Sequence, residues 1–229
     1  MDRRAFLAAT GTALAGCSTG RSESATVPDS LDFDVTKTPS AADVVAFRNP
    51  AWTRLNEKNY AAQGTVENRG DERLARIRID ADFLDADGNL VTQLWTSARF
   101  LEPGERYRFT IPVSGAAGLS RCRYRVTARR DPSVPENDGQ VAVESAEWQS
   151  FNGDAAYGLD GRLRNVSDSF LERVYVYGNF YAGDELLAWW KDGTADLKAD
   201  ATYDWRVPFK GDDPDAVEDW TTTVLVREQ

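Results

Sequence analysis

The residue with the most clearly defined chemistry lies near the start of the chain. Cys17 ends the run Leu14-Ala15-Gly16-Cys17, which has the form of a lipobox. In such a run the cysteine thiol receives a lipid and the residues before it are removed. We therefore expect residues 1–16 to be a signal peptide, and a lipid on Cys17 to hold the mature chain to a membrane.

Two arginines indicate the export route. Arg3 and Arg4 are followed by an apolar stretch from Ala5 to Ala15. This stretch is shorter than the roughly 20 apolar residues that a bilayer-spanning helix needs, so it does not span alone. A basic start, a short apolar region and a lipobox, in this order, predict twin-arginine export of the folded protein. The expected location is the extracytoplasmic face of the cell membrane.

The acidic composition limits the classes of partner. The chain has 37 acidic and 27 basic residues, a net charge of −10, and only five of the basic residues are lysine. The sequence shows no basic stripe that would displace phosphate counterions, so we expect no nucleic acid partner. An acidic, arginine-rich chain with a signal for folded export resembles proteins of salt-loving archaea.

The absence of histidine excludes much catalytic chemistry. Histidine is the usual general base near neutral pH and the commonest ligand of transition metals. Once Cys17 carries a lipid, Cys122 is the one cysteine left, so no intrachain disulfide can form. Cys122 lies in an expected strand, where a small core residue is the favoured interpretation and a reactive thiol the alternative. We expect neither a metal nor a cofactor.

The carboxylates form no recognisable catalytic or metal-binding motif. Asp80, Asp82, Asp85 and Asp87 crowd one expected hairpin, but the glycine and glutamate of an EF-hand loop are not in place. The favoured interpretation is therefore a set of solvated strand and turn residues. A carboxylate-only hydrolase, such as a glycosidase with two acids, stays an alternative to a non-enzymatic protein.

The chain repeats itself after its first 42 residues. Matching residues lie 96 to 98 positions apart, as in the pairs Trp52 and Trp148, Tyr60 and Tyr157, Asn68 and Asn165, Pro112 and Pro208, and Val126 and Val224. This pattern predicts a duplicated domain. We expect a disordered tether at residues 17–42, a first domain at 43–130, a linker at 131–139 and a second domain at 140–229.

Each copy has the pattern of a small antiparallel β-sandwich. Residues 76–83 alternate strictly, with Ile77 and Phe83 on the same face, and Asp87-Gly88 is a two-residue hairpin signal. A two-residue turn places Ala81 opposite Leu94, and the equivalent pair in the second copy is Gly178 opposite Trp190. Since neighbouring strand residues face opposite ways, an inward Trp190 predicts an outward Trp189. The fold class expected is all-β, with two tandem immunoglobulin-like sandwiches.

Three further motifs support this fold. They are Gly64, Val66 and Asn68 at a strand start, the run from Phe83 to Gly88, and the turn Leu101-Glu102-Pro103-Gly104-Glu105. Together they resemble the FxLYD-type immunoglobulin-like domain of extracytoplasmic lipoproteins. The second copy departs at Gly183-Asp184 and at Leu197-Lys198-Ala199-Asp200, where Pro-Gly is missing. The resemblance implies a scaffold fold, an extracytoplasmic location and a role in adhesion or envelope assembly, without catalytic residues.

An aromatic sheet face is the sharpest functional signal. Outward positions that carry Arg78, Asp80, Leu84 and Gln93 in the first copy carry Tyr175, Tyr177, Tyr181 and Trp189 in the second. Such a patch is typical of an interaction site, here for a glycan or an envelope protein. Two alternatives stay open: the face packs on the first domain, or the protein is a purely structural spacer.

One sequon is present. Asn165-Val166-Ser167 is a candidate N-glycosylation site in an exported chain. Asn68 holds the same place in the first copy without a sequon, which favours a role for this asparagine in the turn.

Overall fold

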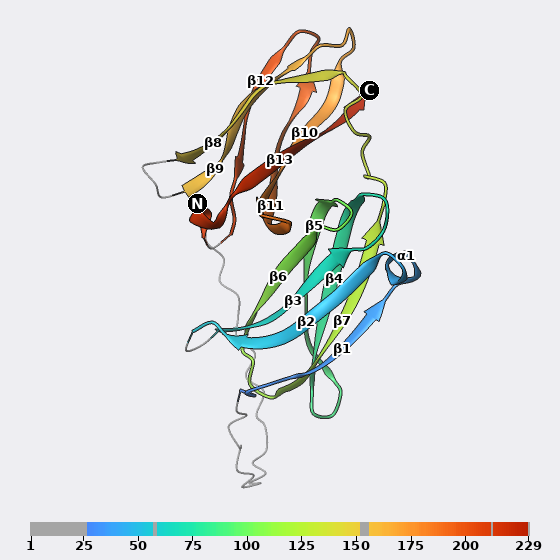
Figure 1. The fold of residues 1–229 in the computed structure, drawn as a ribbon, viewed down its shortest axis with the longest axis vertical. Helices are drawn as coiled ribbons and strands as arrows, with labels where there is room; N and C mark the ends of the chain where they lie inside the picture. Colours follow the sequence, from blue (N-terminus) through green and yellow to red (C-terminus); the bar gives the residue numbers. More distant parts are fainter. Residues whose placement is uncertain (1–26, 57–58, 152–155, 212, 229) are drawn as a thin grey trace, which may run out of the picture.

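The protein is built almost entirely of β-strands (Figure 1). The computed structural model describes residues 27–56, 59–151, 156–211 and 213–228. Within these ranges the two helical turns are α1 (Pro39–Ala42) and η1 (Pro214–Ala216). Across the described part of the chain, no helix has the length and apolar character that crossing a membrane requires.

The first half of the chain forms a sandwich of two sheets. One has the strand order β1-β7-β4-β5, and the other is made by β6-β3-β2. The strands are β1 (Asp32–Lys37), β2 (Val45–Arg54), β3 (Asn59–Asn68), β4 (Leu74–Asp85), β5 (Leu90–Leu101), β6 (Arg106–Ser114) and β7 (Leu119–Arg129). The alternating inner residues of β4, including Ile77, Ile79 and Phe83, are fully buried between these sheets, as the sequence predicts.

The second half repeats this arrangement. Its strands are β8 (Val141–Phe151), β9 (Ala156–Asn165), β10 (Leu171–Ala182), β11 (Glu185–Leu197), β12 (Thr202–Pro208) and β13 (Asp219–Glu228). They form the orders β13-β10-β11 and β12-β9-β8, which correspond strand for strand to β7-β4-β5 and β6-β3-β2. Each half is a Greek-key sandwich of the immunoglobulin-like kind, so the predicted fold class is confirmed.

The paired residues of both central hairpins are the predicted ones, but the expected two-residue turn is wrong for the first: Asp85 bonds to Asn89 across three residues, and a bulge between Phe83 and Leu84 restores the register. Ala81 lies opposite Leu94, and Gly178 lies opposite Trp190. The expectation that Trp190 fills the core is nevertheless wrong, because this side chain is 46% exposed. A Cβ atom added to Gly178 would meet Val207 at 2.9 Å and Leu159 at 3.1 Å, so these residues occupy the inner space that was expected to hold the indole.

The turn that follows β5 and β11 is conserved between the halves despite different residues. Gly104 has a φ of 86°, and Asp200, at the equivalent position, has a φ of 60°. Their backbone N–H groups donate to the carbonyl oxygens of Asn68 and Asn165, at 2.8 and 3.0 Å. The second copy therefore makes the same left-handed turn without its Pro-Gly.

The expected disordered tether is wrong for residues 27–42, since Leu31 is buried in the first core and the segment continues into regular structure. Here β1 runs parallel to β7, and α1 follows it. Phe33 stacks on Tyr124 with ring centroids 5.8 Å apart, so this short strand packs on the core of the first sandwich. The remainder of the tether up to residue 26 lies outside the described residues.

Candidate binding groove between the two sandwiches

The two sandwiches share a sheet. The first residues of β11 pair in parallel with the first residues of β6, Glu185 with Arg106 and Leu186 with Tyr107, and so join three strands of each half into one six-stranded sheet. Leu186 is fully buried and belongs to the hydrophobic cluster of the first half. The second sandwich is thus attached through main-chain bonds and through a side chain inserted into its neighbour's core.

The predicted aromatic face is covered by this contact. Tyr177 is 5% exposed and packs edge-on against Phe100 at 5.1 Å between ring centroids, and Tyr181 is 4% exposed. The expectation of an exposed patch is therefore wrong for these two residues. Strand alternation correctly predicts which face they share, but it does not predict what covers that face.

Trp189 and Tyr175 lie at the margin of the covered face and are half-buried. The indole N–H of Trp189 donates to the carbonyl oxygen of Ser97, and its ring stacks on Tyr177 at 6.1 Å. The hydroxyl of Tyr175 accepts a hydrogen bond from Arg173 at 3.1 Å. Of the four predicted residues, Trp189 links the interdomain contact to the open groove beside it.

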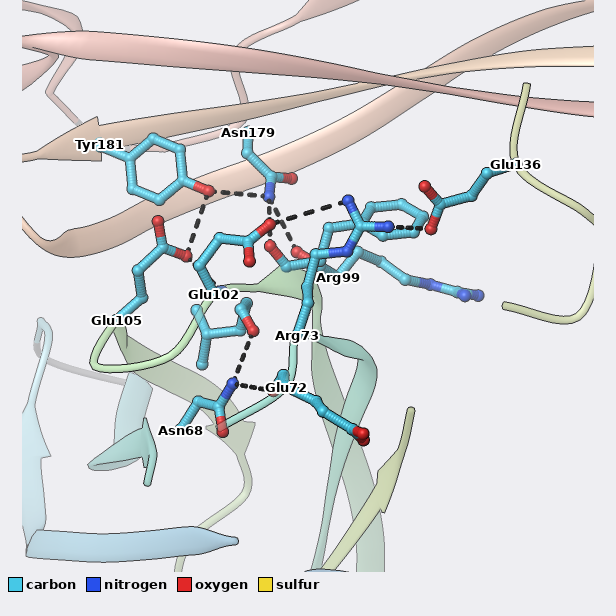
Figure 2. A network of polar contacts seen from close by, with 11 residues as sticks. Asn68, Glu72, Arg73, Arg99, Glu102, Glu105, Glu136, Asn179 and Tyr181 are labelled. Carbon is cyan, nitrogen blue, oxygen red and sulfur yellow. Dashed lines mark hydrogen bonds and ion pairs between the residues drawn. The ribbon is translucent and has the colours of Figure 1, made fainter. Parts of the chain in front are cut away.

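Polar side chains complete the contact between the sandwiches (Figure 2). The amide nitrogen of Asn179 donates to the carbonyl oxygen of Arg99 at 2.8 Å and to the hydroxyl of Tyr181 at 3.1 Å. That hydroxyl donates in turn to the carboxylate of Glu105 at 3.5 Å. In the same view Arg73 lies between two acids, Glu102 at 3.7 Å and Glu136 of the connecting segment.

The carboxyl of Glu105 makes this contact sensitive to pH. Burial raises the pKa of Glu105 above its ordinary value of 4.5. The folded state therefore favours the protonated form, and stability is lost as pH rises from 4.5 through the pKa of the folded state. We expect Glu105→Gln to be more stable than the wild type near pH 7, with the difference vanishing below about pH 4.

Thermal melting of both proteins at the two pH values measures this effect. The matched control is Glu102→Gln, because Glu102 is exposed and pairs with Arg73. An exposed pair is worth at most about 1 kcal/mol, so this variant should be neutral or slightly less stable. A Glu105→Gln variant that melts below the wild type at neutral pH would contradict the assignment.

Beside the contact lies an open groove of about 890 Å³. Its walls come from β5 and β6 of the first sandwich and from β11 and the segment after β12 of the second. Aromatic side chains that line it are Trp95, Tyr107, Trp189, Trp190 and Phe209. Trp95 is 56% exposed and Trp190 is 46% exposed, although tryptophan side chains this large are usually covered in a folded protein.

Charged neighbours hold these indoles in place. The guanidinium of Arg78 lies 4.7 Å from the ring centroid of Trp95 and is itself fixed by an ion pair with Asp80 at 2.7 Å. The ammonium of Lys210 lies 5.8 Å from the ring centroid of Trp190. Cation–π contacts of this kind orient a ring without burying it.

Two arginines of the groove lie opposite each other in the sheet without an ion pair to an acid among the described residues. Arg76 on β4 and Arg99 on β5 are direct partners in the sheet register. Neither forms an ion pair with another residue in the described ranges. Burial, followed by the positive charges of Arg99 and Arg78, lowers the pKa of Arg76. Like charges placed opposite one another in a sheet are destabilising, and the stabilising contacts of Arg99 are with the rings of Tyr177 and Trp189, both at 5.7 Å, rather than with an acid.

The outer side of β7 carries a row of positive charges that the sequence does not predict. Its exposed residues include Arg121, Arg123, Arg125 and Arg129. The premise that the chain has no basic stripe is therefore wrong, because strand alternation gathers residues that are scattered among apolar ones in the sequence. The stripe is partly balanced, since Asp82 pairs with Arg123 at 2.9 Å and Asp32 of β1 lies opposite Arg121 in the register.

The structure assigns a turn role to Asn165. Its side chain is fully buried, and its amide nitrogen donates to the carbonyl oxygens of Ser169 and Leu197 at 2.8 and 3.1 Å. Asn68 makes the same pair of bonds, to Glu72 and Leu101, both at 2.9 Å. Because that nitrogen is the atom a glycan would modify, the predicted glycosylation site is incompatible with the folded protein.

The other predicted site residues within the described ranges have structural roles. Cys122 is buried, and burial raises its thiol pKa to about 12, as fits a core residue. Asp80 and Asp82 pair with arginines, and no group of three or more potential metal-ligating side chains occurs among the described residues. Arg3, Arg4 and Cys17 lie outside the described residues.

The fold defines this chain as an all-β protein with tandem immunoglobulin-like sandwiches. No family model matches it. It is similar to an uncharacterized protein of Methanocaldococcus jannaschii, with 39% identity over 77 residues, which is 31% of this chain and 56% of that protein. A crystal structure of red sea bream transglutaminase aligns with 81% of this chain and 31% of the enzyme, at 9% identity and a TM-score of 0.25. Neither similarity carries a functional argument.

Proposed function

We propose that this chain is a lipid-anchored, non-catalytic binding protein of the cell surface, and that it takes its ligand in the groove between its two sandwiches. The observation that carries the proposal is the exposure of Trp95 and Trp190 on opposite walls of one groove. The surrounding contact is closely packed, so the indoles are not left open by a loose interface. Exposed aromatic side chains in a concave surface are typical of binding sites.

The charged groups of the groove support binding more than catalysis. Glu185 is paired with Arg108 at 3.1 Å, and Asp213 is exposed and accepts a hydrogen bond from the backbone of Asp215. Because Glu185 is held in this ion pair, the described lining of the groove offers no second free carboxylate to act with Asp213, and two-carboxylate hydrolysis requires two. The interface also favours a binding protein with a fixed shape over a jointed spacer.

The binding site is tested with the full chain in detergent. The protein is sedimented with insoluble cell envelopes, and the bound fraction is measured against protein concentration. We expect the double variant Trp95→Ala/Trp190→Ala to bind about tenfold more weakly, the loss of roughly 1.4 kcal/mol that two aromatic contacts account for.

The matched control is Leu90→Ala. Leu90 is as exposed as Trp95 but lies outside the groove. This variant should bind as the wild type does, and all variants should keep the wild-type melting temperature. Unchanged binding by the double tryptophan variant would contradict the assignment of the groove.

The anchor is tested separately. We expect Cys17→Ser to move the protein from the membrane fraction to the soluble fraction, because the serine hydroxyl does not accept the thioether-linked lipid. Arg3→Lys together with Arg4→Lys should leave the protein inside the cell. Membrane retention of the Cys17→Ser protein after a high-salt wash would contradict the lipid anchor.

A further inference from the structure

The groove is positively charged although the whole chain carries a net charge of −10. Its cationic side chains are Arg76, Arg99, Arg108 and Lys210, and its acids are Glu185 and Asp213. Since Arg108 and Glu185 neutralise each other at 3.1 Å, the described lining residues leave three cations with one exposed acid. Charge complementarity therefore favours an anionic ligand.

The Arg76–Arg99 pair is the strongest point of this charge. The two residues lie opposite each other in the register, and the Nε atom of each is buried without a hydrogen-bond partner in the described structure. Arg99 also lies 5.7 Å from the ring centroid of Trp189. A carboxylate accepts hydrogen bonds from two guanidinium groups, so a bound anion would relieve the repulsion between them.

The aromatic lining narrows the class of anion. Trp95 lies on the same outer face of β5 as Arg99, four residues before it, and Trp190 lies across the groove on β11. A large indole surface beside a few charged groups suits a ligand that has both an apolar face and a charge. Sugar rings present such a face through their C–H groups, and uronic acids add a carboxylate to the same ring.

We infer that the groove binds an acidic saccharide, with sugar rings packed against Trp95 and Trp190 and a carboxylate of the same ligand between Arg76 and Arg99. This inference rests on the groove being the binding site of the proposed function. An acidic peptide would pair with the arginines but would leave the two indoles without a matching ring. It is therefore the competing outcome of the test.

The test compares three probes by titration calorimetry with the full chain in detergent. They are trigalacturonate, the uncharged galactotriose and tetraglutamate. We expect trigalacturonate to bind roughly tenfold or more tightly than galactotriose, since each added charge-assisted contact contributes strongly in a partly buried site. Trp95→Ala should weaken both sugars, whereas Arg76→Gln/Arg99→Gln should remove the preference for the acidic one.

The arginine variant has an internal check on its folding. Removing two facing like charges relieves a repulsion, whereas Arg99→Gln also removes the cation–π contacts with Tyr177 and Trp189, so we expect the two effects to offset each other and the melting temperature to change little. The control is Arg121→Gln, which removes an exposed arginine of β7 outside the groove and should keep the preference.

The outcomes separate this inference from the proposed function. Equal affinity for the charged and uncharged sugars, still dependent on Trp95, would overturn the acidic specificity and leave the groove as the binding site. If tetraglutamate binds with the same affinity as trigalacturonate, and Trp95→Ala does not change that affinity, the ligand is a peptide and the saccharide is overturned. If no probe binds while the wild type still binds envelopes, the saccharide is also overturned. If envelope binding does not change in the Trp95→Ala/Trp190→Ala variant, both the groove as the binding site and the saccharide are overturned.

Discussion

Tyr177→Ala is expected to lower the free energy of unfolding by about 3 kcal/mol, the usual range for removing a buried aromatic side chain. The Tyr177 ring contacts Phe100 edge-on at 5.1 Å, Trp189 by stacking at 6.1 Å and the guanidinium of Arg99 at 5.7 Å. Since Phe100 and Arg99 belong to the first sandwich, the substitution removes a contact between the halves. We therefore also expect one unfolding transition to separate into two in scanning calorimetry.

Tyr175→Ala is the matched control for this experiment. Tyr175 lies two residues away on the same face of β10 but is half-exposed at the margin of the contact. Its replacement should cost about 1 kcal/mol or less and should keep a single transition. If the Tyr177→Ala protein is as stable as Tyr175→Ala, the Tyr177 ring does not stabilise the contact between the sandwiches.

The second large effect is expected for Asn165→Ala, at about 3 kcal/mol of unfolding free energy. The substitution removes the donor from the buried carbonyl oxygen of Leu197 and from the part-buried one of Ser169, and a buried unsatisfied group costs about 1–3 kcal/mol. Asn68→Ala should cost a similar amount, because it removes the equivalent bonds in the first sandwich. Urea denaturation of both variants measures the effect.

Ser167→Ala separates the turn from the sequon. Its hydroxyl donates to the side-chain oxygen of Asn165 at 2.7 Å, but the donors to Ser169 and Leu197 remain in this variant. We expect a loss of about 1 kcal/mol and an exported mass that differs from the wild type only by the replaced side chain, because the amide nitrogen of Asn165 is buried and already donates two hydrogen bonds. A lower mass than that of the wild type, beyond the replaced side chain, would contradict the structural role of Asn165.

The sequence carries much of the architecture because the duplication supplies an internal comparison. Strict alternation and the turn signal at Asp87-Gly88, which are both local, predict the pairing of Ala81 with Leu94, although the turn itself spans residues 86–88 and a bulge after Phe83 restores this register. The pairing of Gly178 with Trp190 follows by transfer to the second copy. These signals fix which residues share a face of a sheet.

Local signals do not report what lies over a face. Tyr177 and Trp95 are both outward residues, yet the first is buried against the other sandwich and the second is 56% exposed. The difference depends on how the two halves are joined, through Leu186 and the short pairing of β11 with β6. The groove is defined by this junction, so no single strand pattern predicts it.

The sequence pattern does not predict strand β1, for a related reason. It offers two apolar residues, Phe33 and Val35, within a polar stretch, and its partner β7 lies almost 90 residues further along the chain. A strand this short is stabilised only by pairing with a sheet edge, here that of β7, so its own sequence does not predict it. The Arg76–Arg99 pair likewise needs the register of β4 and β5 to become visible.

The place of β1 in the first sandwich also determines how the protein responds to force. Asp32, at the start of β1, lies beside Arg121 at one end of β7, whereas the second sandwich contacts the sheet near Phe100, at the end of β7 marked by Arg129. Tension between a membrane anchor and a ligand held by both sandwiches would therefore run along the strands. All six register pairs between β1 and β7 would be loaded in shear together, rather than opened one by one. With the proposed lipid on Cys17 and the proposed ligand in the groove, the first sandwich would act as a mechanical clamp between them.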